Sequence, residues 1–388
     1  RPPPITTLFP YTTLFRSVKN ATYFRQCFEA LQRMVENKIL LAGHDISAGG
    51  LVTALLEINF PNCEGGIEAD LSRFDEKDPA RLLFSEDPGV IVQVSEGNLA
   101  GIESIASEFG IVLYNIGKYS TKRELNIKLP KQKLSLDIDK YRDTWFKTSY
   151  LFDIHQVGEE LANERYQNYS KQPLRYKFPA SFTGKTDSSL QSNGRTKTAA
   201  IIREKGSNGE REMAWALYLA GFAVKDVHMT DLVSGRETLE DVSMIVFVGG
   251  FSNADTLGSA KGWAGAFLYN EKAAKALENF YAREDTLSLG VCNGCQLMAE
   301  LGLITPKNRN ISPKMKHNNS HKYESAFVGV TVEDSPSVML GSLSGSSLGI
   351  WVAHGEGKFS FPKEISNYNV ALRYNYQEYP ANPNGSPE

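Results

Sequence analysis

The chain has few cysteines, no long apolar run and no excess of either charge. Only 4 of its 388 residues are cysteine, which is typical of a reducing compartment rather than of a disulfide scaffold. Its 42 Lys and Arg nearly balance 45 Asp and Glu, so no global basic field draws it to nucleic acid or anionic lipid. Apolar stretches such as residues 244–248 fall far short of the roughly 18 residues that a transmembrane helix needs. We therefore expect a soluble, cytoplasmic protein without nucleic acid or membrane partners.

The length and the two ends indicate a multidomain chain that has been cut. At about 150 residues per domain, 388 residues correspond to two or three domains. The chain begins at Arg1 without an export signal, and it stops in the turn-rich residues 380–388, where more chain is expected. Residues 1–17 resemble the translation of a sequencing adaptor. We predict that this segment is not native and leave it out of the fold prediction.

The remaining residues divide into three parts. Residues 18–150 mix helical spacing over residues 23–41 and 97–109 with strand-like runs at 90–94 and 111–114, which predicts an α+β lobe. Residues 151–196 are polar with little periodicity and are predicted to be a linker with at most a short helix near its start. Residues 197–388 alternate strands with helices, which predicts a doubly wound parallel sheet with its active edge at the carboxyl ends of the strands.

The strongest chemical motif lies between a predicted strand and a helix, and reads Gly290-Val-Cys292-Asn-Gly294-Cys-Gln296. A nucleophile at such a turn is exposed at a helix N-terminus, where unpaired N–H groups and the helix dipole favour the thiolate form. We predict that Cys292 is the nucleophile. The N–H of Asn293 and one from the Gly249-Gly250-Phe251 loop, assigned to Gly250, would form the oxyanion hole.

The residues also permit two other interpretations of these cysteines. An isolated Cys292 would be most simply explained as a buried packing residue, and the flanking glycines and Gln296 argue against that. Cys292-Asn-Gly-Cys295 is also a half-site for zinc or a redox disulfide, but only Cys27 and Cys63 remain to complete it and they are far apart in sequence. Cys295 is therefore predicted to pack on the elbow helix.

The motif resembles the nucleophile elbow of class I glutamine amidotransferases, Gly-x-Cys-x-Gly-x-Gln. Further segments resemble the family of large single-chain phosphoribosylformylglycinamidine synthases over residues 18–388. In the C-terminal part these segments are Gly206–Met213, Gly249–Leu257, Lys261–Ala264, His354–Gly357 and Tyr379–Ser386. In the N-terminal part they are His44–Gly50 and Leu83–Glu86, which resemble the last, AIR-synthase-like lobe of the synthetase domain.

The resemblance implies a two-step reaction in purine biosynthesis. Cys292 would attack the side-chain amide of glutamine, form a glutamyl thioester and release ammonia. The ammonia would pass internally to a synthetase site, where ATP has activated the amide oxygen of formylglycinamide ribonucleotide. Displacement of phosphate would give formylglycinamidine ribonucleotide. A shielded route suits this chemistry because ammonium is not nucleophilic.

In the N-terminal lobe the resemblance implies that Asp45 is a magnesium ligand and that Ser47 contacts the nucleotide. Mg²⁺ prefers carboxylate and phosphate oxygen, and a hydroxyl before a helix can meet a phosphate. Without the resemblance, Asp45 reads more simply as a helix cap. Glu86 is a candidate for catalysis, although a structural carboxylate is the simpler interpretation. The lobes that hold the other metal ligands and the acceptor substrate are expected to precede residue 18.

The base for Cys292 is harder to assign. The His354-Gly-Glu356 spacing permits a triad with Cys292. In the family, however, the triad His and Glu follow the segment with which this chain ends, so we expect them beyond residue 388. His354 and Gln296 are then predicted to lie in the glutamine pocket, and His317 and His321 at its rim or in solvent. A cysteine glutaminase that serves another synthetase, or an inactive fragment, remain the alternatives.

Overall fold

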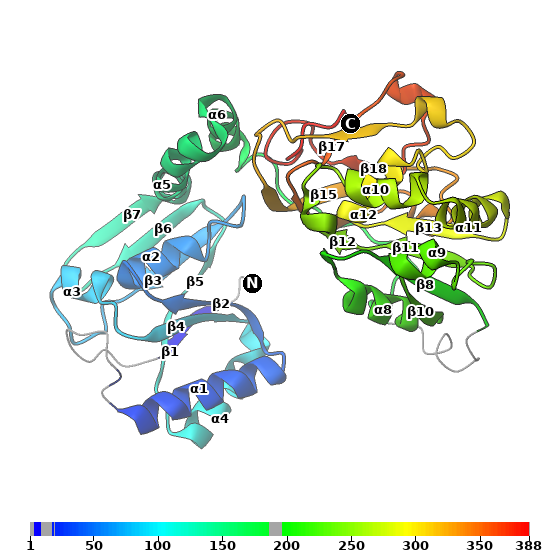
Figure 1. Cartoon of the computed structure of the whole chain (residues 1–388). Coiled ribbons are helices and arrows are strands. Elements are labelled where there is room, and N and C mark those ends of the chain that lie inside the picture. Colours follow the sequence, from blue (N-terminus) through cyan, green and yellow to red (C-terminus); the bar gives the residue numbers. More distant parts are fainter. Residues whose placement is uncertain (1–3, 9–17, 19, 186–195, 388) are drawn as a thin grey trace. The chain divides into compact units, whose positions relative to one another are not determined.

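The chain forms two compact units, Arg1–Leu151 and Phe152–Glu388, shown in Figure 1. The structure is a computed structural model that describes residues 4–8, 18, 20–185 and 196–387. The boundary between the units falls inside helix α5 (Ile138–Val157). Among these residues, no helix is long and apolar enough to cross a bilayer.

The first unit is built on a seven-stranded sheet with the order β2-β4-β1-β5-β3-β6-β7. Neighbouring strands run antiparallel except for β3 and β6, which are parallel. The strands are β1 (Pro4–Leu8), β2 (Leu40–Ile46), β3 (Gly66–Asp70), β4 (Gly89–Val94), β5 (Leu113–Ser120), β6 (Glu124–Lys128) and β7 (Lys133–Asp137). The helices are α1 (Ala21–Glu36), α2 (Gly50–Glu57), α3 (Pro79–Phe84) and α4 (Leu99–Phe109).

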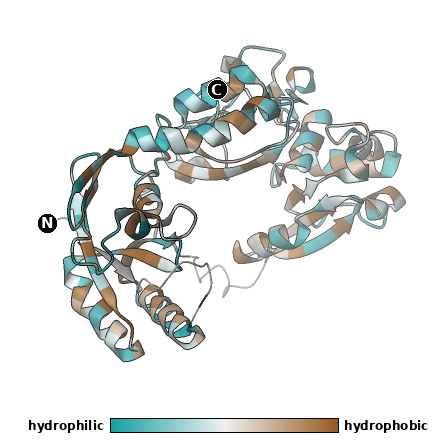
Figure 2. Ribbon diagram, turned by 90° about the vertical axis from the view of Figure 1, so that its left-hand side faces the viewer, coloured by the Kyte–Doolittle hydropathy of each residue, from teal (hydrophilic) through white to brown (hydrophobic). Residues whose placement is uncertain are grey.

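Two hydrophobic clusters attach these helices to the sheet. Leu51 and Leu55 of α2 pack with Ile116 and other buried sheet residues, while Met34 of α1 packs with Val92 and α4. The helices present apolar residues to these clusters and polar residues outward, so both kinds of residue occur along them (Figure 2). Alternation along the strands supplies a side chain to each face, which confirms the predicted α+β lobe.

Two features of this unit differ from the sequence analysis. The helical spacing over residues 23–41 ends early, because α1 stops at Glu36 and Lys38 adopts a left-handed φ of 55°. Leu40 and Leu41 then begin β2. The segment set aside as non-native contributes β1, which lies between β4 and β5. The fold prediction, which excludes residues 1–17, therefore lacks a central strand of the sheet. The adaptor origin of these residues stays a prediction.

The second unit has a four-stranded parallel sheet with the order β10-β8-β11-β13, as the alternating pattern predicts. Its strands are β8 (Thr198–Arg203), β10 (Ala223–His228), β11 (Met244–Phe247) and β13 (Leu287–Gly290). The helices around it are α8 (Glu210–Leu219), α9 (Met229–Ser234), α10 (Lys261–Leu268), α11 (Glu271–Ala282) and α12 (Asn293–Glu300). Three smaller sheets pair β9 (Ser207–Asn208) with β12 (Gly249–Gly250), β14 (Lys314–Lys316) with β17 (Lys358–Ser360), and β15 (Glu324–Val332) with both β16 (Ser347–His354) and β18 (Leu372–Tyr374).

Strand β11 is buried along its whole length and shows how this sheet is covered. Ile245 and Phe247 enter one cluster with Trp263, whereas Val246 faces the opposite cluster with Leu217. A strand that is apolar on both faces is the usual pattern in a parallel sheet with helices on each side. This confirms the predicted fold class of the C-terminal domain.

The predicted linker is largely helical over its first half. Helix α5 extends to Val157, and α6 (Glu159–Asn168) follows after Gly158. Beyond the unit boundary at residue 152, these residues pack with the C-terminal domain. Their hydrophobic patterning is weak because α6 is held by polar contacts, which a search for apolar periodicity cannot detect.

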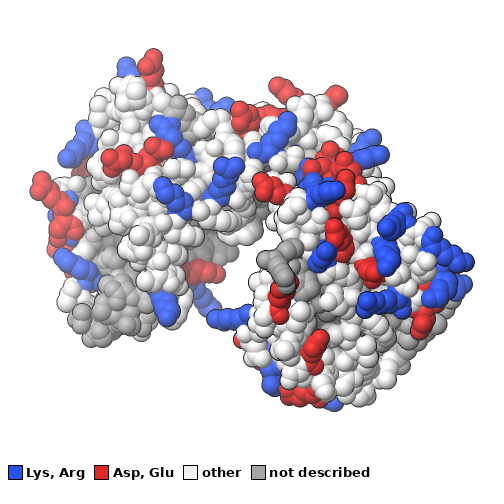
Figure 3. Space-filling view, turned by 180° about the vertical axis from the view of Figure 1, so that it is seen from behind, with Lys and Arg blue, Asp and Glu red and all other residues white. Residues whose placement is uncertain are grey.

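Charges of both signs are interspersed on the face of each unit drawn in Figure 3, in keeping with the near-neutral composition.

Candidate functional site

Cys292 stands at the turn between β13 and α12, where the elbow motif placed it. It is exposed, and its backbone has φ 52° and ψ -110°, a region that non-glycine residues rarely occupy. Such strain is a known feature of nucleophile elbows, because it projects the side chain away from the strand and the helix. The Sγ atom lies 3.4 Å from the carbonyl oxygen of Ala353 on β16.

The elbow glycines are required by close backbone contacts. A Cβ atom on Gly294 would lie 2.1 Å from the Phe247 carbonyl oxygen, and one on Gly290 would lie 2.6 Å from the carbonyl oxygen of Gly294. Gly249, which follows β11, would bring a Cβ within 3.3 Å of the Cβ of Cys292. The glycine pattern therefore reflects the tight crossing of β11, β13 and α12 at Cys292.

The N–H of Asn293 opens helix α12 directly after the nucleophile. The first N–H groups of a helix lack partners within it. Over the described residues, the backbone bonds of this turn begin one residue later, where Gly294 donates to the Val291 carbonyl at 2.8 Å. The Asn293 N–H is not among the donors of these turn bonds, and its role as an oxyanion donor stays a prediction.

Gly250 lies on the loop that faces the elbow. Its φ is 104°, and an added Cβ would lie 2.5 Å from the Asn208 nitrogen, so only glycine fits there. The next N–H along the loop, that of Phe251, donates to the Gly206 carbonyl at 2.9 Å and is already engaged. In the Gly249-Gly250-Phe251 loop, the Gly250 N–H therefore stays the predicted second donor of the oxyanion hole.

The side chain of Gln296 joins the elbow to the turn after β16. Its Oε1 accepts from Asn293 Nδ2 at 2.8 Å, and its Nε2 donates to the Glu356 carbonyl at 2.9 Å. Asn293 Oδ1 in turn accepts from the Ser252 N–H at 3.1 Å. Gln296 is buried, so its amide acts here as a brace between these segments. A direct contact with glutamine stays a prediction.

His354 ends β16 next to Ala353, and thus borders the nucleophile. Asn318, which is fully buried, holds it: its Nδ2 donates to the His354 carbonyl at 2.7 Å, and its Oδ1 lies 3.1 Å from His354 Nδ1. Burial lowers the pKa of His354, which favours the neutral imidazole. The loop around Asn318 was predicted only as a polar rim, and nothing in its sequence pattern marked this residue.

Glu356 does not orient His354. Its Oε2 accepts from the N–H of Ser259 at 2.6 Å and from the Ser259 hydroxyl at 2.5 Å, and its Oε1 lies 3.3 Å from His317 Nε2. The carboxylate therefore anchors the loop before α10. Within the described part of the chain the Cys292-His354-Glu356 triad is not assembled, and a pocket role for His354 stays a prediction.

Cys295 lies on α12 beside the nucleophile but in a different environment. Burial raises the pKa of its thiol to about 11, so it stays protonated near neutral pH. No group of three or more His, Cys, Asp or Glu among the described residues could hold a metal ion. Both observations favour a packing role for Cys295.

In the first unit, the structure brings the two N-terminal motifs together. A Cβ on Gly50 would lie 2.6 Å from the Phe84 carbonyl carbon, and the N–H of Gly49 donates to Glu86 Oε1 at 2.9 Å. Ser47 is exposed in the turn before α2, where its carbonyl accepts from the Gly50 N–H at 3.0 Å. The N–H groups of Gly49 and Gly50 are thus occupied by Glu86 and Ser47.

Asp45 fits a magnesium site only as one contributor. Its side chain is 73% exposed near the end of β2, and it is not part of a cluster of potential ligands in the described residues. Mg²⁺ typically takes one or two carboxylates together with phosphates and water. Asp45 can supply one such ligand, and the residues around it do not form a metal site by themselves.

The family comparisons bear on both units. Residues 196–388 match the CobB/CobQ-like glutamine amidotransferase domain, and residues 10–129 match the C-terminal domain of AIR synthase related proteins. A probable phosphoribosylformylglycinamidine synthase of Arabidopsis thaliana, named chloroplastic/mitochondrial, is 38% identical over 94% of this chain. The phosphoribosylformylglycinamidine synthases of Homo sapiens and Dictyostelium discoideum are 36% and 34% identical over 93% and 95% of it.

The chain belongs to the phosphoribosylformylglycinamidine synthase family. It spans 27% of the Arabidopsis relative, 29% of the human one and 30% of the Dictyostelium one. A solved structure titled "Structure of PurLQS from Thermotoga maritima" is 27% identical over 49% of this chain and 78% of its own, with a TM-score of 0.38. Membership in the family rests on the sequence matches.

Proposed function

We propose that the second unit hydrolyses glutamine through Cys292 and that the ammonia serves a phosphoribosylformylglycinamidine synthase reaction. The observation that carries the proposal is the strained, exposed Cys292 at a glycine-flanked elbow, directly before the Asn293 N–H that begins α12. The family supplies the substrate: the matching domain is named a glutamine amidotransferase, and the relatives carry the synthase name.

In the proposed reaction, Cys292 Sγ attacks the side-chain amide carbon of glutamine. The oxyanion of the tetrahedral intermediate accepts a hydrogen bond from Asn293 N–H, with Gly250 as the second donor. The thiol gives up its proton, the amide nitrogen gains one as the C–N bond breaks, and ammonia leaves. Water then hydrolyses the remaining thioester to glutamate and restores the Cys292 thiol. His354, whose pKa is lowered by burial, is proposed to line the pocket, and it is not assigned as the base because the Cys292 thiol hydrogen-bonds the neighbouring Ala353 carbonyl.

For the complete reaction, ATP and formylglycinamide ribonucleotide are the further proposed substrates. ATP would activate the amide oxygen of formylglycinamide ribonucleotide by phosphorylation. Ammonia would then attack the same carbon and displace that oxygen as phosphate. Asp45 and Ser47 are the residues of the first unit proposed to contact magnesium and nucleotide, and Mg²⁺ would neutralise phosphate charge. Remaining synthetase lobes are proposed partners of this unit. A cytoplasmic location also stays a prediction.

The nucleophile is tested with 6-diazo-5-oxo-norleucine, an electrophile shaped like glutamine. Cys63, which is exposed in the first unit, is the internal reference, and the adducts are located by peptide mass spectrometry. We expect labelling at Cys292 in large excess over Cys63, its suppression by glutamine, and its loss in Cys292→Ser. Equal labelling of both cysteines would show that no glutamine pocket has formed and would refute the proposed function.

A further inference from the structure

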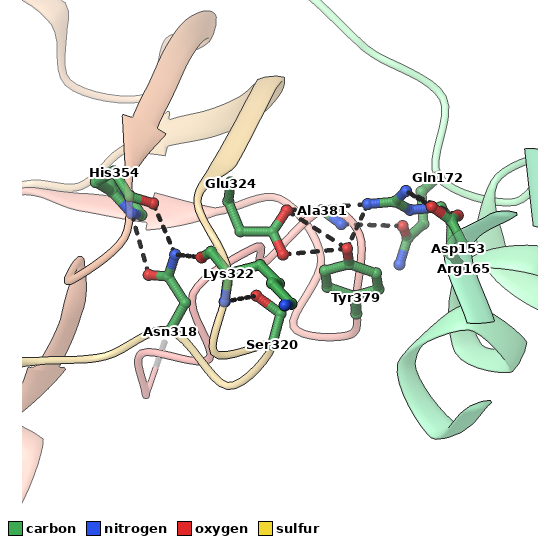
Figure 4. A network of polar contacts seen from close by, with 10 residues as sticks. All are labelled: Asp153, Arg165, Gln172, Asn318, Ser320, Lys322, Glu324, His354, Tyr379 and Ala381. Carbon is green, nitrogen blue, oxygen red and sulfur yellow. Dashed lines mark hydrogen bonds and ion pairs between the residues drawn. The ribbon is translucent and has the colours of Figure 1, made fainter. Parts of the chain in front are cut away.

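Helix α6 reaches the candidate pocket through a buried polar network, drawn in Figure 4. We propose that Arg165 of α6 is a positioning residue for the glutamine pocket beside Cys292, acting through Tyr379 and Glu324. This inference rests on the proposed function. It assigns a role at the site to a segment that the sequence pattern identifies only as a linker.

Arg165 is the centre of the network. Its Nη1 donates to both carboxylate oxygens of Asp153 at 2.8 Å, and its Nη2 donates to the hydroxyl of Tyr379. Its guanidinium carbon also lies 4.8 Å from the centroid of the Tyr379 ring. The Tyr379 hydroxyl contacts the Glu324 carboxylate at 3.2 and 3.4 Å, and Arg165 itself comes within 3.9 Å of Glu324.

The buried partners make this arrangement sensitive to the loss of Arg165. Asp153, Glu324 and Tyr379 are only 6%, 5% and 4% exposed. Among the ion pairs of the described residues, both buried carboxylates have the same guanidinium, that of Arg165, as their partner. Removing one member of such a set leaves an uncompensated buried charge, so the surrounding segments must shift to admit water.

The side of the network opposite α6 leads to the pocket. Glu324 begins β15 and pairs with His354 across the β15 and β16 hairpin. Directly opposite residues in an antiparallel pair present their side chains on the same face of the sheet. Ala353, the neighbour of His354, places its carbonyl 3.4 Å from Cys292 Sγ. A shift of Glu324 therefore displaces the strand end that borders the nucleophile.

A second set of contacts ties α6 and the turn after it to the C-terminal segment. Three polar side chains spaced four residues apart bind the backbone of residues 378–381. Glu164 accepts from the Tyr379 N–H at 2.8 Å, and Asn168 donates to the Tyr379 carbonyl at 3.1 Å. Gln172 donates to the Glu378 carbonyl at 3.2 Å and accepts from the Ala381 N–H at 3.3 Å.

That C-terminal segment in turn supports the loop that holds His354. The Asn384 carbonyl accepts from Asn319 N–H at 3.2 Å, next to Asn318. Asn318 binds both the His354 carbonyl and the Gly357 N–H. Two routes from α6, one through Glu324 and one through residues 378–384, thus converge on the His354 strand end.

A control arginine with similar contacts distinguishes a positioning role of Arg165 from a merely structural one. Arg283 contacts a carboxylate, Asp285, and an aromatic ring, Phe280, and its side chain is 28% exposed against 26% for Arg165. It donates to the carbonyls of Leu239, Glu240 and Val242, before β11, and so lies away from the carboxyl ends of the strands. Arg283→Met should lower stability without affecting the pocket.

The test measures how glutamine protects Cys292 from iodoacetamide in the full chain. The alkylation rate at Cys292 is followed by peptide mass spectrometry as a function of glutamine concentration, with Cys63 as reference. We expect Arg165→Met and Tyr379→Phe each to raise the half-protecting glutamine concentration, the former by roughly tenfold, as sub-ångström misplacement of site residues does. The half-protecting concentration of Arg165→Lys should lie between those of wild type and Arg165→Met, because lysine keeps the charge but cannot form the two-pronged hydrogen bonds of a guanidinium.

The outcomes separate this inference from the proposed function. The positioning role holds if glutamine protects wild-type Cys292 and Arg165→Met raises the half-protecting glutamine concentration more than Arg283→Met does at an equal loss of stability. If wild type is protected but Arg165→Met and Tyr379→Phe have the same half-protecting glutamine concentration as wild type, the inference is wrong and the proposed function stands. If glutamine gives no protection in wild type, the proposed function fails and this inference falls with it.

Discussion

Gly294 lies so close to Phe247 that a Cβ atom on it would stand 2.1 Å from the Phe247 carbonyl oxygen. This contact fixes the distance between the elbow helix and β11, and hence the position of Cys292 above the sheet. The neighbour is backbone rather than a flexible side chain, so no rotamer change can relieve the overlap.

The first prediction concerns this glycine. Gly294→Ala should destabilise the second unit by about 3 kcal/mol or more, at the upper end of overpacking costs, and should abolish selective labelling of Cys292. Urea denaturation and the labelling assay measure the two effects. Gly265→Ala is the matched control: it also sits in a helix, but its Cβ would meet only the Tyr269 ring at 3.7 Å, and it should stabilise by about 0.5 to 1 kcal/mol.

The second prediction separates the four cysteines by pH. At pH 8, iodoacetamide should modify the exposed Cys63 and Cys292 and leave Cys27 and Cys295 intact. Burial raises the pKa of each of the latter two thiols to about 11, so their reactive thiolates form only as the pH approaches that value. Fast alkylation of Cys295 at pH 8 would contradict the packing role assigned to it.

The third prediction tests the brace formed by Gln296. Gln296→Met keeps the volume but leaves Asn293 Nδ2 and the Glu356 carbonyl without their partner. The cost is about 1 to 3 kcal/mol for the buried Asn293 amide and less for the part-buried Glu356 carbonyl. We expect a lower urea midpoint together with slower selective labelling of Cys292. The exposed Gln156→Met should change neither by a measurable amount. An unchanged midpoint in Gln296→Met would show that water replaces both bonds.

The fourth prediction follows from the lowered pKa of His354. Because the folded pKa lies below the unfolded value of about 6.5, the unfolded state binds the proton more readily, and stability falls as the pH drops through 6.5. Above that value this contribution is fully present. Denaturant midpoints at pH 5 and pH 8 should differ less in His354→Gln than in wild type. The exposed His155→Gln should keep the wild-type difference.

Much of this architecture follows from local patterns. The alternation over residues 197–301 specifies strands and helices whose order leads to a parallel sheet, and Gly290, Cys292 and Gly294 identify the elbow because tight backbone crossings accept only certain residues. Such features are readable because each depends on neighbours within a few positions. The weak points were segments without apolar periodicity, above all α6, which is held by hydrogen bonds to residues more than 200 positions away.

The sequence by itself therefore determined the class of the C-terminal domain, the elbow position of Cys292 and the family motifs of both units, while the role of Cys292 as nucleophile stays a prediction. Only the tertiary structure decided that Glu356 anchors Ser259 instead of orienting His354, that Glu86 binds the Gly49 turn, and that Arg165 and Tyr379 meet Glu324. These pairings join side chains from distant segments. Their formation depends on how buried charges and amides find partners in the folded core, which spacing along the chain does not encode.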